Sequence, residues 1–297
     1  MLGRALVHQL VDRGIQVLRL VGCADTAEEV RATGAVPVVG SLSEGGRWQD
    51  EAAADWVFHL PSHTFDGRRI SRRNARAIAA QRVSTDAHVL DALTRGGTER
   101  LIYVSDASYY GATGPAPVTE DAMPRPTAWG RCFAPALDRL DGYVLAGLPA
   151  IIAFPGWVYG NGDWCRLRVI DPVTAGRRVL AVGTPAPWVS PIHVIDCARA
   201  LIHLAERGRV GQRYFLVNDA PVRLSTFAST FGRLADRPVH LRRVPSLLAK
   251  PLVGAVLYQH VTRDAIFSAS RLRGLGFQCA CPTLEHGLQE VVGNLHA

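Results

Sequence analysis

The chain has 297 residues, of which 48% are apolar, and a formal net charge of +7. This length and apolar share suffice for one large α/β unit with a full hydrophobic core. The positive charge is mostly arginine and is spread along the chain, with no basic tail and no basic run interleaved with aromatic residues. This distribution argues against a nucleic-acid partner.

Cysteine usage and hydropathy exclude further classes of protein. The six cysteines are scattered without a C-x-x-C spacing, which fits neither a zinc site nor the disulfide framework of a small secreted domain. We therefore expect no metal, and reduced thiols in a cytoplasmic protein. The longest apolar-leaning stretch, 244–258, contains Lys250 and two prolines and is shorter than a bilayer span, so we expect no membrane contact.

Helix and strand patterns alternate along the N-terminal half. Residues 1–14 place apolar side chains at helical spacing and end in Gly14, a favourable helix stop. A capped helix is predicted over 26–34. The predicted strands cover residues 15–22, 35–42, 55–62 and 101–104. Alternation of this kind predicts an α/β fold with a doubly wound parallel, Rossmann-like sheet.

An arginine-dense stretch, 65–82, allows two interpretations. The simpler one is a solvated helix face. The functional one is an anion clamp, because guanidinium groups bind phosphate or carboxylate bidentately. The acidic and histidine side chains that follow, Asp86, His88 and Asp91, are expected to be surface or helix-packing residues.

The candidate chemistry begins directly after the strand 101–104. The turn Ser105–Ser108 follows the carboxyl end of this strand, and ligands of open parallel sheets bind beyond such ends. Asp106 and Ser108 are therefore the first catalytic candidates, with Tyr110 close by.

Three segments carry a family resemblance: LIYVSDASYYG (101–111), WGRCF (129–133) and LPAIIAFPGWVYGNGD (148–163). They resemble the extended branch of the short-chain dehydrogenase/reductase superfamily, which contains sugar-nucleotide epimerases, dehydratases and related reductases. The resemblance extends over essentially the whole chain. It implies NAD or NADP as cofactor, a small-molecule substrate and a homodimer. It also implies a nucleotide-binding part over 1–160 and a mainly substrate-binding part over 161–297, with 189–219 returning to the main sheet.

The same resemblance places Trp129 and Phe133 at the family's catalytic Tyr and Lys positions. In the family, the Tyr hydroxyl exchanges a proton with substrate, while the Lys lowers the Tyr pKa and holds the nicotinamide ribose. An indole N–H does not ionise usefully and a phenyl ring has no polar atom, so this relay is absent. The family's Ser or Thr falls on Asp106. We expect a dry pocket to raise the pKa of Asp106 and make it the general acid/base, with the Ser108 hydroxyl as orienter.

The resemblance also assigns ligand-binding residues. Cofactor contacts fall on Gly3, Ser105, Pro155, Gly156 and Val158. Substrate contacts fall on Trp129, Arg131 and Trp157.

The cofactor positions depart from the family pattern in several places. Met1-Leu2-Gly3 matches only the end of the glycine loop, and the family's first strand has no counterpart. Such a sheet would leave two strand edges unpaired, which favours a start placed too far downstream over a lost phosphate loop. Other polar cofactor positions are changed as well: they read Gly22-Cys23, Gly40-Ser41-Leu42 and His59-Leu60-Pro61-Ser62. Ordinary dinucleotide binding is therefore left open.

Four further residues receive structural interpretations. Glu120 and Asp121 are expected to cap their loop. Cys132 is expected to be a buried small residue instead of a reactive thiol. His193 and Asp196 match a family segment in which they are chiefly structural.

Three functions compete on this evidence. The first is an NAD(P)-linked epimerase, dehydratase or reductase. The second is a non-redox cyclase, lyase or isomerase on the same scaffold, with Asp106 as general base. The third is a binding module for a dinucleotide or metabolite. Loss of the Tyr–Lys pair from an otherwise familiar scaffold favours an atypical enzyme of the superfamily that does not use this relay.

Overall fold

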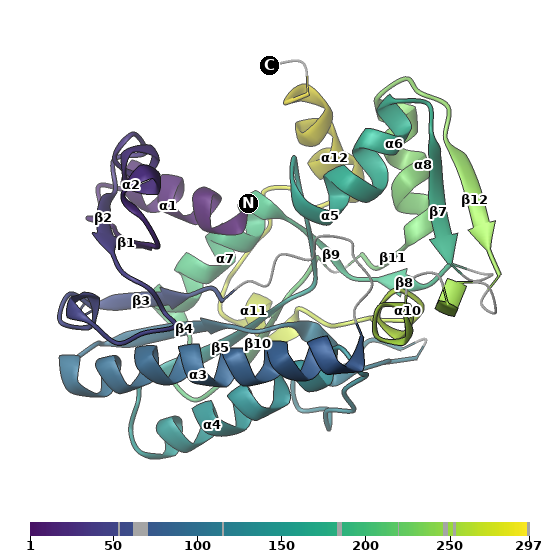
Figure 1. Ribbon diagram of the computed structural model, residues 1–297. Coiled ribbons are helices and arrows are strands. Elements are labelled where there is room, and N and C mark those ends of the chain that lie inside the picture. The colour runs from purple at the N-terminus through teal and green to yellow at the C-terminus, as the bar shows by residue number, and fades with distance from the viewer. Residues whose placement is uncertain are drawn as a thin grey trace.

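The computed structural model describes the chain except residues 53, 62–70, 115, 183–185, 219, 246–248, 252–253 and 296–297. Its centre is a four-stranded parallel sheet in the order β10-β5-β4-β3. The strands are β3 (Trp56–His59), β4 (Arg100–Val104), β5 (Ala150–Pro155) and β10 (Arg213–Leu216). Helices α3 (Arg72–Gly96) and α4 (Ala134–Leu145) cover one face, and α7 (Val194–Arg207) covers the other (Figure 1). The predicted doubly wound α/β class is confirmed.

Side chains of β4 alternate between the two faces of this sheet, as the period of a strand requires. Leu101 and Tyr103 are fully buried in the core formed with α3 and α4. Ile102 is fully buried in the opposite core, formed with α7 and α1 (Leu2–Asp12). With both faces covered, chemistry is confined to the edge where the strands end.

The N-terminal strands form a sheet of their own. β1 (Leu18–Val21) and β2 (Val36–Val39) pair in parallel, with Leu18 opposite Val36, and α2 (Ala24–Arg31) lies between them in the chain. Within the described residues, β1 pairs only with β2, and β3 only with β4. The N-terminus lies in the middle of the molecule, between this unit and the C-terminal part (Figure 1).

The C-terminal part contains three small two-stranded sheets. β6 (Trp157–Tyr159) pairs in parallel with β9 (Pro191–His193), and β7 (Arg178–Val182) pairs in parallel with β12 (His240–Val244). β8 (Trp188–Val189) pairs antiparallel with β11 (Val222–Arg223). The helices are α5 (Asp163–Cys165), α6 (Asp171–Thr174), α8 (Leu224–Leu234), α10 (Ala255–Val261), α11 (Ser270–Gly274) and α12 (Leu284–Gly293). A separate core around Phe227, Phe231 and Leu288 holds α8 and α12 together.

The arginine-dense stretch divides at the start of α3. Ser71 caps the helix, since its hydroxyl accepts the Asn74 N–H at 3.1 Å. Arg72, Arg73 and Arg76 are exposed, which confirms the solvated-face interpretation for them. Arg82, by contrast, is 3% exposed. Ser62, Arg68 and Arg69 lie outside the described residues.

None of the helices in the described part of the chain combines the length and apolar character that a bilayer span requires.

Candidate active site

The site is built on the turn that follows β4. Asp106 begins a single 3-10 turn, Ala107–Tyr110, by accepting the Ser108 N–H at 2.6 Å through Oδ1. Its second oxygen, Oδ2, accepts the indole N–H of Trp129 at 3.1 Å. Gly130 makes this contact possible, because a Cβ there would lie 2.1 Å from the Ser108 carbonyl oxygen. Two predicted site residues, Asp106 and Trp129, are thus brought together.

Helix α10 closes the site from the C-terminal part. It is fastened to the loop before Trp129, since the Gln259 side-chain oxygen accepts the Ala128 N–H at 3.1 Å. The His260 ring lies parallel to the Trp157 ring, with 6.0 Å between centroids and 5° between planes. It also lies 6.3 Å from the Trp129 ring. The predicted substrate residues Trp129 and Trp157 therefore share one histidine neighbour.

Arg263, just beyond α10, is buried beside the same carboxylate. It is 7% exposed, and its Nη1 donates to the Gly111 carbonyl at 3.0 Å. Burial alone would raise the pKa of Asp106, but attraction to His260 in its protonated form and to Arg263, with hydrogen bonding from Ser108, holds this pKa below its usual value. The expectation that a dry pocket raises the pKa of Asp106 is wrong, because Arg263 brings a positive charge close to the carboxylate.

His260 is neutral at physiological pH. Burial and the neighbouring charge of Arg263 lower the pKa of its imidazole from 6.5 to about 4, against the opposing attraction of Asp106. The standing charges of the site at neutral pH are therefore the carboxylate of Asp106 and the guanidinium of Arg263. A neutral imidazole beside them is free to accept a proton.

Several polar atoms at this edge of the sheet are buried without a hydrogen-bond partner. They are Ser105 Oγ, Ser108 Oγ, Thr127 Oγ1, His260 Nδ1 and Arg263 Nε. Buried polar atoms in native proteins are nearly always paired, and each unpaired one costs about 1–3 kcal/mol. Such atoms on neighbouring segments mark a place where a ligand or water supplies the missing partners.

Ser108 and Tyr110 contribute differently from Asp106. Ser108 is completely buried beside the carboxylate. The Tyr110 hydroxyl donates to the Glu120 carbonyl at 3.1 Å, and its ring packs against Phe154 and Phe215. Burial also raises the pKa of Tyr110. The structure thus commits Tyr110 to the core and does not bring its hydroxyl to Asp106.

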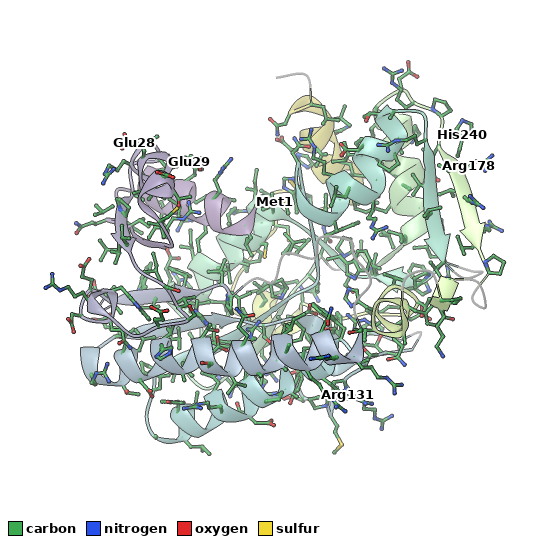
Figure 2. All side chains as sticks on the ribbon, in the orientation of Figure 1. Met1, Glu28, Glu29, Arg131, Arg178 and His240 are labelled. Carbon is green, nitrogen blue, oxygen red and sulfur yellow. The ribbon has the colours of Figure 1, made fainter. Side chains whose placement is uncertain are left out.

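Arg131 lies at the surface. Its Nε donates to the Pro126 carbonyl at 3.3 Å, and its side chain is exposed. Figure 2 shows it beside the layer of α3 and α4, whereas Met1 lies on the other side of the sheet. The structure does not bring Arg131 to the other substrate-binding candidates.

Phe133 occupies the family's Lys position, and its ring packs against the buried guanidinium of Arg82. The Arg82 guanidinium lies 5.1 Å from the centroid of Phe133. Its Nε and Nη2 donate to the Tyr103 hydroxyl at 3.2 and 3.0 Å, so its hydrogen bonds are used within the fold. The chain has a single lysine, Lys250, and this residue is exposed. No second lysine exists that could replace the missing one.

The predicted cofactor residues flank the same edge of the sheet. Gly3 lies in the first turn of α1, where a Cβ would meet nothing within 4 Å. Pro155 ends β5, and a Cβ on Gly156 would lie 2.1 Å from the Ser190 carbonyl oxygen, so only glycine fits there. Val158 lies next to Trp157 in β6. Ser105 adds its buried, unpaired hydroxyl.

His260 and Arg263 were not among the sequence candidates. They lie about 150 residues beyond Asp106 in a segment, LYQHVTRDA, that matches no family motif. The available signal was chemical: a histidine and an arginine three residues apart, directly after an apolar stretch.

The structural interpretations made from sequence have mixed outcomes. The Glu120 carboxylate also reaches beyond its own loop, because it accepts the Phe215 N–H of β10 at 2.7 Å. Asp196 is structural as expected, because it accepts the N–H groups of Ala280 and Cys281 at 2.7 and 2.9 Å. Cys132 is buried, as expected, and burial raises the pKa of its thiol to about 11.

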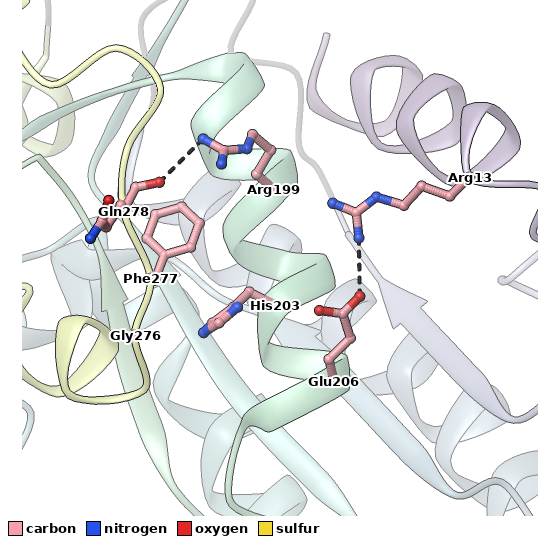
Figure 3. Close-up of a pocket in the computed structure, with 7 residues that line it drawn as sticks. All are labelled: Arg13, Arg199, His203, Glu206, Gly276, Phe277 and Gln278. Atoms are coloured by element: carbon pink, nitrogen blue, oxygen red, sulfur yellow. Dashed lines mark hydrogen bonds and ion pairs between the residues drawn. The ribbon is translucent and has the colours of Figure 1, made fainter.

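A cavity of about 190 Å³ lies beside α7, away from the candidate residues (Figure 3). Arg13 and Arg199 line it, but each is already paired, with Glu206 and Asp196 respectively, at 3.0 Å. None of the candidates at the strand ends lines this cavity. It is a surface cleft bounded by ion pairs. Among the residues that the structure describes, no three His, Cys, Asp or Glu side chains are placed to hold a metal ion.

A parallel sheet with helices on both faces and polar residues at its strand ends defines a Rossmann-like α/β protein. The chain belongs to the NAD dependent epimerase/dehydratase family, whose model matches residues 1–217. The family predicted from the sequence motifs is therefore confirmed.

Individual relatives agree with this assignment. A ketoreductase of Stigmatella aurantiaca, named for 4-hydroxy-2-methyl-3-oxo-4-farnesyl-3,4-dihydroquinoline-1-oxide, is 27% identical over 282 residues, which are 91% of this chain and 82% of the relative. The solved dTDP-glucose 4,6-dehydratase of Bacillus anthracis in complex with NAD superposes with a TM-score of 0.81 at 16% identity, covering 100% and 93% of the chains. A human epimerase family protein with NADPH superposes with a TM-score of 0.75 at 20% identity, covering 94% and 100%. At these identities the two structures establish the shared fold.

Proposed function

We propose that the protein is an NAD(P)-dependent oxidoreductase that interconverts a ketone and a secondary alcohol on a small-molecule biosynthetic intermediate, without the family's Tyr–Lys relay. The observation that carries this proposal is the similarity to a ketoreductase along most of both chains. Membership of a family named for its NAD dependence supports the cofactor.

The residues present fit a dinucleotide at the carboxyl edge of the sheet. The N-terminus of the eleven-residue α1, with open space at Gly3, suits a pyrophosphate, because backbone N–H groups and the helix dipole favour anions there. The unpaired hydroxyl of Ser105 offers a further polar partner, and Pro155, Gly156 and Val158 would line the cofactor side of the crevice. When bound, the nicotinamide would donate or accept a hydride.

Trp129 and Trp157 would form the substrate side, and their rings suit an apolar or planar substrate. In this proposal residues 1–160 mainly bind the dinucleotide, while 161–297 mainly bind the substrate. The six free cysteines are consistent with a cytoplasmic enzyme. A homodimer is part of the proposal, and sedimentation of the purified protein would test it.

The test begins with binding. We expect NADH or NADPH, titrated into the purified protein, to quench tryptophan emission and to saturate. Gly3→Asp should weaken this binding at least tenfold, because a carboxylate in the first turn of α1 repels the pyrophosphate. Gly142→Asp, at an exposed position within α4 that also has open space, is the matched control and should leave binding unchanged.

Turnover then separates the competing functions. With a panel of cyclic and aromatic ketones, we expect ketone-dependent oxidation of the nicotinamide. Turnover of an intermediate without any nucleotide would replace the proposal with a non-redox reaction. Saturable nucleotide binding without turnover of any ketone or alcohol would favour a binding module.

A further inference from the structure

Two nitrogen-bearing side chains of the segment around α10, His260 and Arg263, lie near Asp106. Arg263 is more than nine-tenths buried, yet its Nε has no hydrogen-bond partner. His260 Nδ1 is likewise buried and unpaired, although the ring is held between Trp157 and Trp129. Neither group stabilises the fold through these atoms, and unpaired polar atoms in such a position are typical of a site that meets its partner in the bound substrate.

We propose that His260 and Arg263 are the catalytic pair that takes the place of the Tyr–Lys relay, with His260 transferring the proton and Arg263 stabilising the charge on the substrate oxygen. This inference rests on the proposed oxidoreductase function, which it deepens by naming the residues that carry out its acid/base step.

The reaction balances in both directions. In alcohol oxidation, the carbinol C–H bond breaks and its hydride passes to the oxidised nicotinamide, which becomes reduced. The O–H bond also breaks, its proton passes to His260 Nδ1, and its electron pair forms the C=O double bond. In ketone reduction, a hydride would reach the carbonyl carbon and the π pair would move to the oxygen. The His260 imidazole would take a proton from the solvent and pass it to that oxygen, which returns His260 to its neutral state.

Arg263 acts on the charge that develops during this exchange. The substrate oxygen carries partial negative charge while the proton and the hydride are in transfer. A fixed guanidinium N–H in a buried pocket stabilises that charge without reorganising, and one such donor is worth about a hundredfold to a thousandfold in rate.

Asp106 is a positioning residue in this arrangement. Its two oxygens are committed to the Ser108 N–H and the Trp129 indole, so they fix the turn and the ring against which His260 lies. Its charge also balances Arg263, which allows a buried guanidinium to persist next to a neutral imidazole.

The other ionisable groups nearby are unsuited to proton transfer. Cys132 is too weak an acid, since burial raises the pKa of its thiol to about 11. Tyr110 donates to Glu120, and Lys250 is exposed. The groups that electrostatically face His260 are Asp106 from the β4 turn and Arg263 beyond α10, while Trp129 and Trp157 are uncharged.

The first experiment needs no cofactor or substrate. Imidazole NMR of the purified protein should find the pKa of His260 near 4. Arg263→Gln should raise this pKa, because the neighbouring positive charge is removed. A His260 pKa of ordinary value that does not respond to Arg263→Gln would overturn the pairing.

The second experiment separates catalysis from binding. His260→Gln should lower kcat about a hundredfold or more while the dissociation constant for NADPH stays within threefold of native. Arg263→Gln should lower kcat by a similar factor, and Arg263→Lys should recover part of it. Free imidazole added to His260→Ala should restore turnover. His240→Gln and Arg242→Gln, exposed on β12, are the matched controls.

The outcomes distinguish the two proposals. If native protein binds no nucleotide or turns over no ketone, the proposed oxidoreductase function fails. If native protein turns over and His260→Gln keeps kcat within threefold, the catalytic pair is wrong while the function stands. If the His260 variants fail to fold and imidazole gives His260→Ala no activity, His260 is structural and the pair is equally wrong.

Discussion

Asp86 is a buried carboxylate and Asp106 a half-buried one, and each is surrounded by a histidine, an arginine and an aromatic donor. At Asp86 the partners contact one another: His59 Nε2 lies 2.7 Å from one oxygen, and the Tyr103 hydroxyl donates to the other. At Asp106 the carboxylate is satisfied, but the histidine and the arginine each keep an unpaired buried atom. The same residue types thus form a closed network that stabilises the fold in one place and an open site in the other.

The residues at the family's Tyr and Lys positions connect these two clusters. Trp129 donates to Asp106, Phe133 lies beneath Arg82, and the two rings meet edge to face at 5.5 Å. At the two positions where the family has its proton-transferring Tyr and Lys, this chain has an aromatic contact that joins the Asp86 cluster to the Asp106 cluster.

The largest effect is expected from breaking the closed network. Asp86→Ala leaves Arg82 without its counter-charge in the core and should lower the free energy of unfolding by about 3–5 kcal/mol. Urea denaturation measures this loss, with Asp138→Ala, exposed on α4, as control. A loss below about 1 kcal/mol would mean that the network contributes little to stability.

The pH dependence of stability should separate the two clusters. In the unfolded chain His260 binds a proton below about pH 6.5, whereas in the fold it does so only near pH 4. The free energy of unfolding should therefore fall by up to about 3 kcal/mol as the pH is lowered through that interval. His260→Gln should remove most of this slope, leaving a smaller part from His193, whose pKa burial also lowers. Asp86, whose pKa its partners lower, should lose its contribution only below about pH 4 in both proteins. An unchanged slope in the variant would contradict the neutral state of His260.

Asp106→Asn should affect activity more than folding. The amide oxygen can replace one of the two accepting oxygens, but Arg263 loses its balancing charge. Without the attraction of Asp106, the pKa of His260 should fall further. We expect kcat to fall about thirtyfold to a hundredfold, or about 2–3 kcal/mol in the transition state. Steady-state kinetics and unfolding of the same variant give the comparison. A stability loss as large as that of Asp86→Ala would show that this cluster is also a closed structural network.

The smallest effect is expected at the aromatic contact. Phe133→Leu removes the ring beneath Arg82 and the edge contact of that ring with Trp129. Loss of the two contacts should lower the free energy of unfolding by about 1–2 kcal/mol. Thermal unfolding measures it. Combined with Asp106→Asn, the change should be non-additive by more than about 0.5 kcal/mol if the rings couple the two clusters. Strict additivity would show that the clusters are independent.

The sequence predicted the fold and half of the candidate site. The β4 pattern, the polar turn at Asp106 and the motif around Gly156 are local in the chain, so their spacing identifies them. Asp106 and Trp129 could be placed together by resemblance. His260 and Arg263 could not, because only the folding of the C-terminal part brings α10 against the β4 turn. The direction of the Asp106 pKa shift was missed for the same reason. The sequence pattern around Asp106 indicates burial, but it does not show that Arg263, far away in the chain, lies close to the carboxylate.

The single lysine has a practical consequence. The carbonyl of Lys250 accepts the N–H of Gly254, the residue that precedes α10, so its exposed amine lies close in the chain to the helix of His260. Once the more acidic α-amine has been blocked near neutral pH, an amine-reactive dye added at alkaline pH will attach at Lys250. One fluorophore would then report whether α10 moves when a ligand enters.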